Sequence, residues 1–300
     1  MGNYSNIQWC DSTVNGTTGC DGCELWPGPC YAGYLHTTRL ALSLPALYAR
    51  DFTEVRLAPG RMVKAAGWAD MRGRARPTKP WIPPETPRLI FVGDMGDLFS
   101  KAVPFDYVYK EVIVNARSAK GSRHNWLLLT KYPRRMAEFA DLLISQNDPW
   151  PENVWAGTSV TRAKTLSRLD HLKRVPARIR YVSVEPMLEN IDLTPYLRWL
   201  SWAILGGESD QSPHKARPFD LACARSIRDQ CKTAGVPFFL KQLGSRPYDS
   251  NIKMHARNQE RVTNEVSLRD SHGGDMTEWP EDLRVREMPE VGAVVTGASS

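Results

Sequence analysis

The sequence predicts an α/β protein, built as a full or partial (β/α) barrel with a short C-terminal appendage. Short apolar runs without polar alternation recur along the chain, which is typical of parallel strands buried on both faces. Longer amphipathic stretches separate these runs and predict helices that cover the sheet. Polar and glycine-containing segments follow most of the runs, as expected for the loops that carry the chemistry of a barrel.

Each apolar run is expected to form one strand, and each amphipathic stretch one helix. We expect strands at residues 7–9, 54–57, 89–92, 126–129, 154–156, 181–184, 202–205 and 237–240. We expect helices at residues 31–48, 105–119, 134–145, 162–174 and 219–234. The last of these helices contains Cys223 and Cys231, which are expected to be buried small apolar side chains.

The apolar rhythm stops near residue 245. Residues 1–245 are therefore expected to form the barrel, and residues 246–300 a polar C-terminal extension that is partly disordered. Residues 291–300 are small and cannot bury enough apolar surface to order themselves, so they are expected to form a disordered tail.

The composition is that of an ordinary globular protein, with 300 residues, 42% hydrophobic and 24% charged. Apolar runs stay well short of the ~20 residues that cross a bilayer, and the N-terminus does not resemble a signal peptide. We therefore expect a cytoplasmic protein, where clustered cysteines bind metals or act in catalysis. The net charge of +6 permits a polyanionic partner without requiring one.

Three cysteines near the N-terminus form the most informative motif. Cys20, Cys23 and Cys30 have the spacing C-x2-C-x6-C in a loop that contains glycine and proline. A structural zinc site is closed by four protein ligands, whereas a [4Fe–4S] cluster bound by three cysteines leaves one iron open. S-adenosylmethionine (SAM) binds such an open iron in radical SAM enzymes before it is cleaved to a radical. We therefore expect a [4Fe–4S] cluster and SAM as cofactors.

Cys10 leaves other interpretations open. As a fourth ligand it would make the chain a zinc-stabilised nucleic-acid-binding protein without catalysis. A disulfide within the group is a further alternative. The role of Cys10 cannot be decided from the sequence.

Polar side chains follow the expected strands, and parallel strands place such residues at one mouth of a barrel. We assign Glu185 and Lys131 as candidate catalytic residues. The candidate cofactor-binding residues are Gly206, Gly207, Glu208, Asp94 and Ser159, with Asp97 and Lys241 as further residues of the same mouth. The carboxylate of Glu208 could accept a charge-assisted hydrogen bond from the amino group of SAM, and the glycines would let the backbone approach the cofactor.

Several short runs occur together in the order of a known family. They are TGC (18–20), PCYA (29–32), DMGDLF (94–99), LLTKYP (128–133), SVEPML (183–188), GGES (206–209), ARPF (216–219) and GVPFFLKQ (235–242). Over residues 5–245 the chain resembles the phage Gp37/Gp68 family, also called DUF5131. That family resembles radical SAM enzymes, so the resemblance implies a barrel of the radical SAM type. Most radical SAM enzymes use C-x3-C-x2-C, from which the present spacing departs.

The resemblance also implies a function in phage DNA modification. The expected enzyme is of the isomerase or lyase type and acts on a modified DNA base by hydrogen abstraction. It would isomerise a glycyl adduct of thymine in hypermodified DNA that evades host restriction. The implied partners are double-stranded phage DNA and an electron donor such as flavodoxin or ferredoxin, in the host cytoplasm. A radical SAM DNA-repair lyase is the alternative within the same class.

A base in duplex DNA must leave the stack to reach a barrel mouth. Residues 72–81 combine arginines, Lys79 and Trp81, and we expect this excursion to lie over the mouth as a wedge or clamp on DNA.

Overall fold

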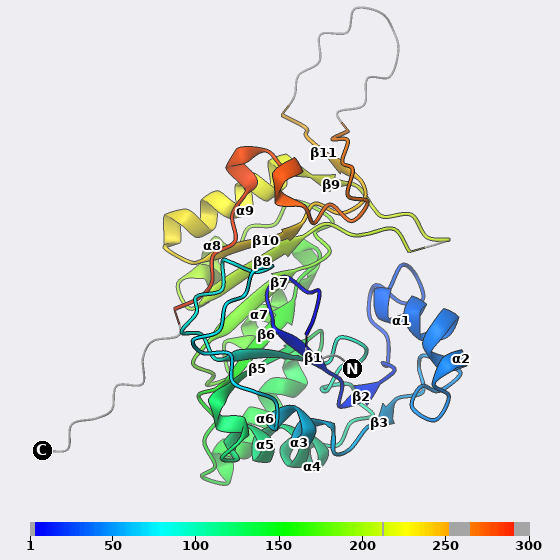
Figure 1. Cartoon of the computed structure of the whole chain (residues 1–300), viewed down its shortest axis with the longest axis vertical. Coiled ribbons are helices and arrows are strands. Elements are labelled where there is room, and N and C mark those ends of the chain that lie inside the picture. The colour runs from blue at the N-terminus through cyan, green and yellow to red at the C-terminus, as the bar shows by residue number, and fades with distance from the viewer. Residues whose placement is uncertain (1–3, 212, 252–264, 291–300) are drawn as a thin grey trace, which may run out of the picture.

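A curled, seven-stranded parallel sheet forms a half-barrel in the computed structural model, which describes residues 4–211, 213–251 and 265–290 (Figure 1). The strand order is β1-β4-β5-β6-β7-β8-β10. These strands are β1 (Ser12–Val14), β4 (Arg88–Val92), β5 (His124–Thr130), β6 (Val154–Ser159), β7 (Arg180–Val184), β8 (Trp202–Gly206) and β10 (Phe238–Gln242). The expected α/β class and partial barrel are therefore confirmed.

Two small sheets accompany the half-barrel. β2 (Thr17–Thr18) pairs antiparallel with β3 (Arg56–Leu57), and β9 (Phe219–Asp220) pairs parallel with β11 (Pro247–Tyr248). The helices are α1 (Tyr31–Leu35), α2 (Ala41–Ser43), α3 (Arg61–Ala66), α4 (Phe105–Val108), α5 (Val114–Arg117), α6 (Pro133–Ser145), α7 (Ser167–Leu172), α8 (Thr194–Leu197) and α9 (Leu221–Ala234). Short π-helices lie at His36–Leu40 and Tyr109–Ile113, and 3-10 helices at Gly121–Arg123, Ala163–Thr165, Met276–Glu278 and Glu281–Leu283.

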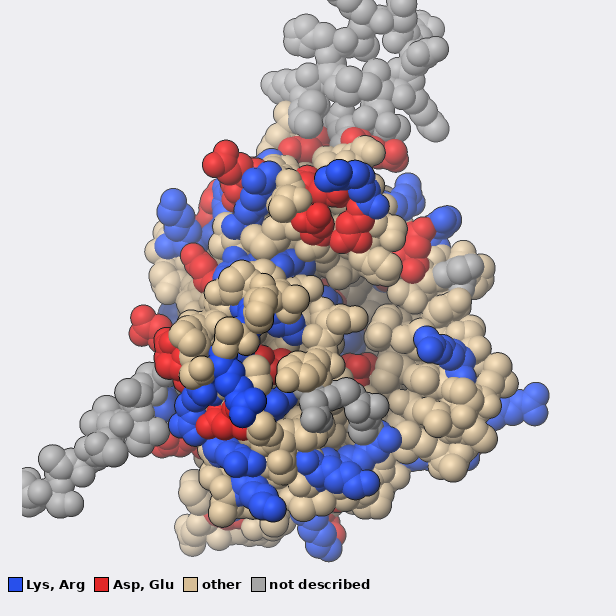
Figure 2. Space-filling view, viewed as in Figure 1, with Lys and Arg blue, Asp and Glu red and all other residues tan. Residues whose placement is uncertain are grey.

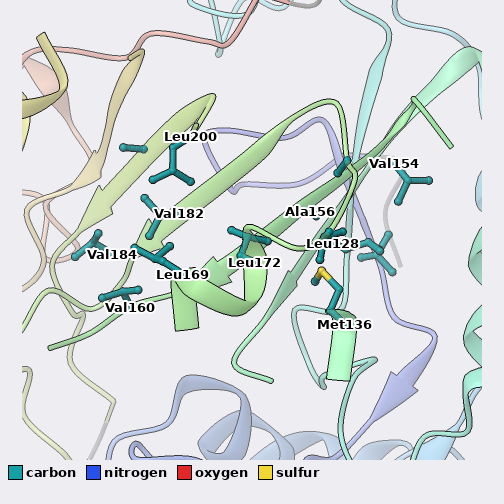
Figure 3. Close-up of a cluster of buried hydrophobic side chains, with 14 of the residues drawn as sticks. Leu128, Met136, Val154, Ala156, Val160, Leu169, Leu172, Val182, Val184 and Leu200 are labelled. Carbon is teal, nitrogen blue, oxygen red and sulfur yellow. The ribbon is translucent and has the colours of Figure 1, made fainter. Parts of the chain in front are cut away.

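The strands form where the apolar runs predict them because both sheet faces are covered. All five residues of β4 and of β8 are buried, which leaves no solvent face for polar alternation. The outer face packs against α6 and α7 through Leu128, Met136 and Leu169 (Figure 3). The inner face forms a second, aromatic cluster that contains Trp155 and Trp202.

Helix α9 shows how local signals set a boundary. The side chain of its N-cap, Asp220, accepts a hydrogen bond from the backbone N–H of Ala222, and the helix ends at Gly235 with φ +66°. Cys231 is fully buried in the outer core, and Cys223 packs partly buried against it. The expected burial is therefore confirmed for Cys231, whereas Cys223 is only partly buried.

Two of the expected strands are wrong. Residues 7–9 do not form a strand, because Trp9 turns into the half-barrel and packs 4.6 Å from Phe91, ring centroid to ring centroid. The first strand is instead the short and more polar β1. Residues 54–57 contribute only β3, outside the large sheet. The expected helix over 31–48 ends as α2 at Ser43, shortly before Pro45, since proline disfavours helix in the residue before it.

Residues 265–290 pack against the rest of the folded protein and contribute to its core. Trp279 and Leu283 are buried in the same core cluster as the large sheet. The expectation of disorder lies outside the described residues at 252–264 and 291–300. Within the described ranges, no helix is long and apolar enough to span a membrane.

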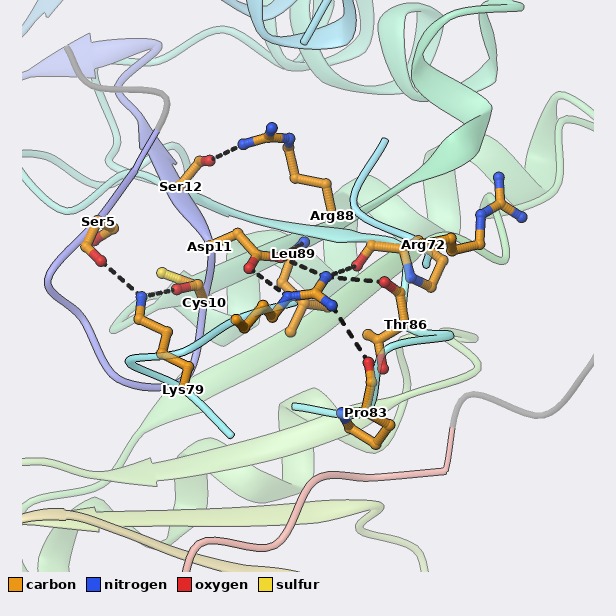
Figure 4. A network of polar contacts seen from close by, with 12 residues as sticks. Ser5, Cys10, Asp11, Ser12, Arg72, Lys79, Pro83, Thr86, Arg88 and Leu89 are labelled. Atoms are coloured by element: carbon orange, nitrogen blue, oxygen red, sulfur yellow. Dashed lines mark hydrogen bonds and ion pairs between the residues drawn. The ribbon is translucent and has the colours of Figure 1, made fainter. Parts of the chain in front are cut away.

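Two of the cations in the excursion over residues 72–81 are buried and paired within the protein. Arg76 is buried and forms an ion pair with Asp11, with Nε 2.7 Å from Oδ1. Lys79 is also buried and donates to the carbonyl oxygens of Ser5 and Cys10 (Figure 4). The excursion packs against the chain that precedes β1, so Arg76 and Lys79 stabilise the fold, and the expected contact of residues 72–81 with DNA stays a prediction.

Candidate functional site

A cavity of about 1020 Å³ lies at the carboxyl ends of the parallel strands. In the view of Figure 2, Lys and Arg predominate in the lower part of the molecule and are mixed with Asp and Glu in the upper part. The cavity is lined by nearly all the residues that the sequence singled out, namely Cys20, Cys23, Cys30, Asp94, Asp97, Lys131, Ser159, Glu185, Gly207, Glu208 and Lys241. Its volume is that of sites that hold a cofactor or a drug-sized ligand.

The cysteine loop is shaped by its own backbone hydrogen bonds. The N–H of Cys20 donates to the carbonyl of Phe52 at 2.9 Å, and the N–H of Trp26 donates to that of Cys23 at 3.0 Å. Gly19 adopts φ +79°, and a Cβ there would lie 2.6 Å from the carbonyl oxygen of Glu54. Glycine is therefore required directly before the first cysteine.

Side chains from the rim of the sheet clamp this loop in place. Arg168 binds Glu24 through two hydrogen bonds of 2.9 and 2.6 Å, and Thr161 donates to the same carboxylate at 3.0 Å. The hydroxyl of Tyr132 donates to the carbonyl of Gly22. The loop is thus tied to the ends of β5 and β6 before any ligand binds.

The pKa values of this loop shift in opposite directions, although burial favours the protonated form of each group. Burial alone would raise the pKa of Glu24, but the hydrogen bonds and charge of Arg168 lower it to about 2. Burial raises the pKa of the Cys20 thiol to about 12, and it also raises that of Cys23, where the charge of Lys131 opposes the shift. A metal bound here must therefore displace protons from these thiols.

The donor set fits an iron–sulfur cluster in its chemistry. Three thiols from one loop line one cavity, and thiolates favour iron–sulfur clusters, zinc or copper(I). In the described part of the chain, no three His, Cys, Asp or Glu side chains already surround a common metal position. Cys10 is fully buried among the inner aromatic cluster and does not line the cavity, so the structure does not bring a fourth cysteine to the loop.

Two aspartates behind the loop are held by the fold. Asp97 is buried and accepts hydrogen bonds from the Thr130 hydroxyl at 2.7 Å and the Lys131 N–H at 2.9 Å. Asp94 accepts from the side-chain amide of Asn15 at 2.5 Å. Burial raises the pKa of both carboxyls, although their hydrogen bonds oppose the shift. Asp97 therefore links the ends of β4 and β5, while Asp94 faces the cavity.

Glu185 and Lys241 form an ion pair inside the cavity, with Oε1 3.1 Å from Nζ. The hydroxyl of Ser183 donates to the other carboxylate oxygen at 2.9 Å. A Cβ at Gly206 would lie 2.7 Å from Oε1 of Glu185. Gly206 itself is not among the cavity-lining residues, so its role is to leave room for Glu185 rather than to approach a ligand.

Glu208 lines the cavity and forms an ion pair with Arg217. Arg217 donates to both carboxylate oxygens, from Nη2 at 2.6 Å and from Nε at 2.9 Å. Gly207 is required because a Cβ would lie 2.1 Å from the carbonyl oxygen of Leu243. Gly206 thus leaves room for Glu185, and Gly207 lets the end of β8 pack against the chain after β10, while the expected approach of Gly207 to a cofactor stays a prediction.

Sequence reasoning missed several residues of the site. Asn15, Tyr132 and Arg217 hold the acids and the cysteine loop, and the last two occur in the quoted runs LLTKYP and ARPF without an assigned role. Cavity-lining residues of the C-terminal segment were also missed, namely Asp270, His272, Gly274 and Asp275. No periodicity marks this segment, so only its buried tryptophan, Trp279, could have indicated that it folds.

Comparison with known proteins places the chain in a family. The family model described as "Protein of unknown function (DUF5131)" matches residues 4–271. The chain belongs to the DUF5131 family. The DUF5131 match covers the large sheet and the cysteine loop, and it ends within the C-terminal loop that lines the cavity. No curated protein and no solved structure matches the chain.

Proposed function

We propose that this DUF5131 protein is a radical SAM enzyme that acts on a modified base in DNA. The observation that carries the proposal is the placement of Cys20, Cys23 and Cys30 on one loop at the mouth of a half-barrel. Three cysteines would hold a [4Fe–4S] cluster and leave one iron for SAM. When bound, the cluster supplies the electron that cleaves SAM to methionine and a 5′-deoxyadenosyl radical.

The chain's own residues would orient the reactants and exclude water. Trp9 and Phe91 give the cavity an aromatic lining, which keeps solvent from a reactive species. Glu208, fixed by Arg217, retains carboxylate lone pairs that can accept from an amino group of SAM. The paired Glu185 and Lys241, together with Lys131, would hold polar groups of the substrate or move a proton on it.

The proposed substrate is double-stranded phage DNA that carries an amino-acid adduct of thymine. Hydrogen abstraction at the glycyl carbon would begin an isomerisation from nitrogen to carbon attachment, in a modification that evades host restriction. The family resemblance and the net charge of +6 support this substrate. A flavodoxin or ferredoxin would deliver the electron in the host cytoplasm.

The test is SAM cleavage after anaerobic reconstitution with iron and sulfide. We expect dithionite-reduced protein to form 5′-deoxyadenosine, measured by mass spectrometry, and the Cys20→Ala, Cys23→Ala and Cys30→Ala variants to form none above background. Cys223→Ala is the matched control, since this cysteine lies on α9 away from the cavity.

Iron uptake separates the alternatives in the same experiment. One outcome would contradict the proposal: the protein takes up zinc but no iron, and it makes no deoxyadenosine with or without modified DNA. That result would favour a zinc-bound nucleic-acid-binding module instead of an enzyme. Cleavage that needs modified DNA would support both the class and the substrate.

A further inference from the structure

The half-barrel has an open edge at β10, and a later part of the chain covers it. β1 and β10 are the two ends of the large sheet. The N–H of Leu240 donates to the carbonyl of Val285, and the N–H of Glu287 donates to that of Phe238, both at 2.9 Å. Residues 285–287 therefore lie antiparallel along the free edge of β10.

The same segment reaches the mouth of the cavity through residues 270–275. Asp270, His272, Gly274 and Asp275 line the cavity. The Asp270 carboxylate accepts three backbone N–H groups, from His272 at 2.9 Å, Gly274 at 2.7 Å and Asp275 at 3.0 Å. The carbonyl of Gly273 accepts from the N–H of Leu243 at 2.8 Å. This loop is thus ordered by its own contacts and fastened to the chain after β10.

Arg286 joins the two parts. Its buried guanidinium donates to the carbonyls of Leu240 at 3.1 Å, Lys241 at 2.8 Å and Gly274 at 3.1 Å. Its Cζ lies 4.2 Å from the ring centroid of Trp81 and 5.0 Å from that of Trp279, which stabilises the charge by cation–π contact. One side chain therefore links the end of β10 to the cavity-lining loop.

We propose that residues 265–290 form a wall of the candidate site and that Arg286 is the residue that positions it. The wall presents Asp275, whose Oδ1 accepts from Thr277 at 2.9 Å, so that Oδ2 is left for a hydrogen-bond-donating group of the substrate. Arg286 also holds the backbone of Lys241, the partner of Glu185. The proposed function enters this inference only where a substrate is expected in the cavity; the positions of the wall and of Arg286 do not depend on it. Arg286 lies beyond the residues that match the family.

Thiol labelling tests the wall without any cofactor. Wild type, Arg286→Met and Arg284→Met would be treated with N-ethylmaleimide, and modification of each cysteine followed by mass spectrometry. Cys20, Cys23 and Cys30 are half-buried and line the same cavity as residues 270–275. We therefore expect Arg286→Met to raise their labelling rates by up to about tenfold, because losing charged hydrogen bonds favours opening of the wall by roughly that factor. Arg284 is the matched control, since it is exposed and its donors reach the carbonyls of Trp279 and Thr277, neither of which lines the cavity.

Two fully buried cysteines show whether each variant is still folded. Cys10 and Cys231 should stay unlabelled while the fold is intact. Unchanged labelling of the cavity cysteines in Arg286→Met, with Cys10 and Cys231 protected, would overturn the proposal.

If Arg286→Met unfolds, hydrogen exchange of the wild-type protein tests whether residues 265–290 are packed against the sheet. The amides of Leu243 and Glu287 should then exchange as slowly as those of β8, and exchange at the rate of unprotected amides would refute the wall. Neither readout involves iron or SAM, so a failure of SAM cleavage would leave this proposal standing.

Discussion

Glu24 and Arg168 lie 144 residues apart in the chain, yet their ion pair holds the cysteine loop against the end of the sheet. The pair is one of several contacts by which single side chains fix the site. Asn15 holds Asp94, Tyr132 holds Gly22, and Arg217 holds Glu208. Each supporting residue is one that a ligand need not touch, so its loss should act through position rather than through chemistry.

Replacing Glu24 with Gln should destabilise the protein in a pH-dependent way. The folded pKa of about 2 lies below the ordinary value of 4.5, so the stabilisation is complete above pH 4.5 and is lost as the pH falls toward 2. We expect Glu24→Gln to lower the free energy of unfolding by about 2 kcal/mol at pH 7, after allowance for solvent screening of a pair at the pocket edge.

Urea denaturation at pH 7 and at pH 3 measures this difference. Glu138→Gln is the control, because Glu138 pairs with the exposed Arg134 within α6 and should change stability little. A difference between wild type and Glu24→Gln that is the same at pH 3 as at pH 7 would show that the carboxylate charge is not what holds the loop.

At the scale of elements, the ends of β8 and β10 approach so closely that side chains are excluded between them. Gly207 follows β8, and the carbonyl oxygen of Leu243 after β10 occupies the position of its missing Cβ. This contact places Glu208 and Lys241 on neighbouring strand ends at the cavity. The packing of these ends therefore determines the site as directly as the polar side chains do.

Gly207→Ala should be one of the more damaging small substitutions in the molecule. The added Cβ would lie 2.1 Å from a backbone oxygen that cannot move alone, and we expect a loss of roughly 3 kcal/mol or more of unfolding free energy. Thermal unfolding would measure the change, with Gly67→Ala as the control because its nearest atom lies at 3.2 Å. Equal midpoints for the two variants would contradict the close approach.

At the scale of the whole molecule, two cores meet across one sheet, and the C-terminal segment contributes to the outer core. Trp279 is buried in that cluster, and its indole Nε1 donates to the carbonyl of Gly273 at 2.9 Å. The segment also covers the β10 edge, so its packing and its place at the cavity depend on each other. It should therefore unfold together with the sheet.

Trp279→Ala tests this cooperativity. We expect a loss of about 3–5 kcal/mol, the usual cost of removing a buried tryptophan, in a single unfolding transition. Ile144→Ala on the exposed face of α6 should cost far less. Two separate transitions, with the sheet unaffected by the substitution, would mean that the segment is an independent appendage.

Features that depend on local sequence could be predicted, whereas features that depend on contacts between distant residues could not. Strands β4 to β8 and helix α9 were predictable because burial on both faces and an N-cap leave local signals. Strand β1 was not, because its Ser-Thr-Val sequence carries no apolar run while Trp9 nearby does. The cysteines and polar loop ends were found from position in the chain, but the contacts that hold them join residues far apart, which no local pattern reveals.

The order in which the wall occurs in the chain has a consequence for how the protein matures. Residues 265–290 follow all seven strands of the large sheet, so during translation the ribosome releases them last among these elements. Until then the edge of β10 would lack its contacts with residues 285–287, and the cysteine loop would face a cavity without the proposed wall. A bulky inorganic group delivered by another protein would then have a route in, and this route would close only after residues 265–290 have left the ribosome and packed against the sheet.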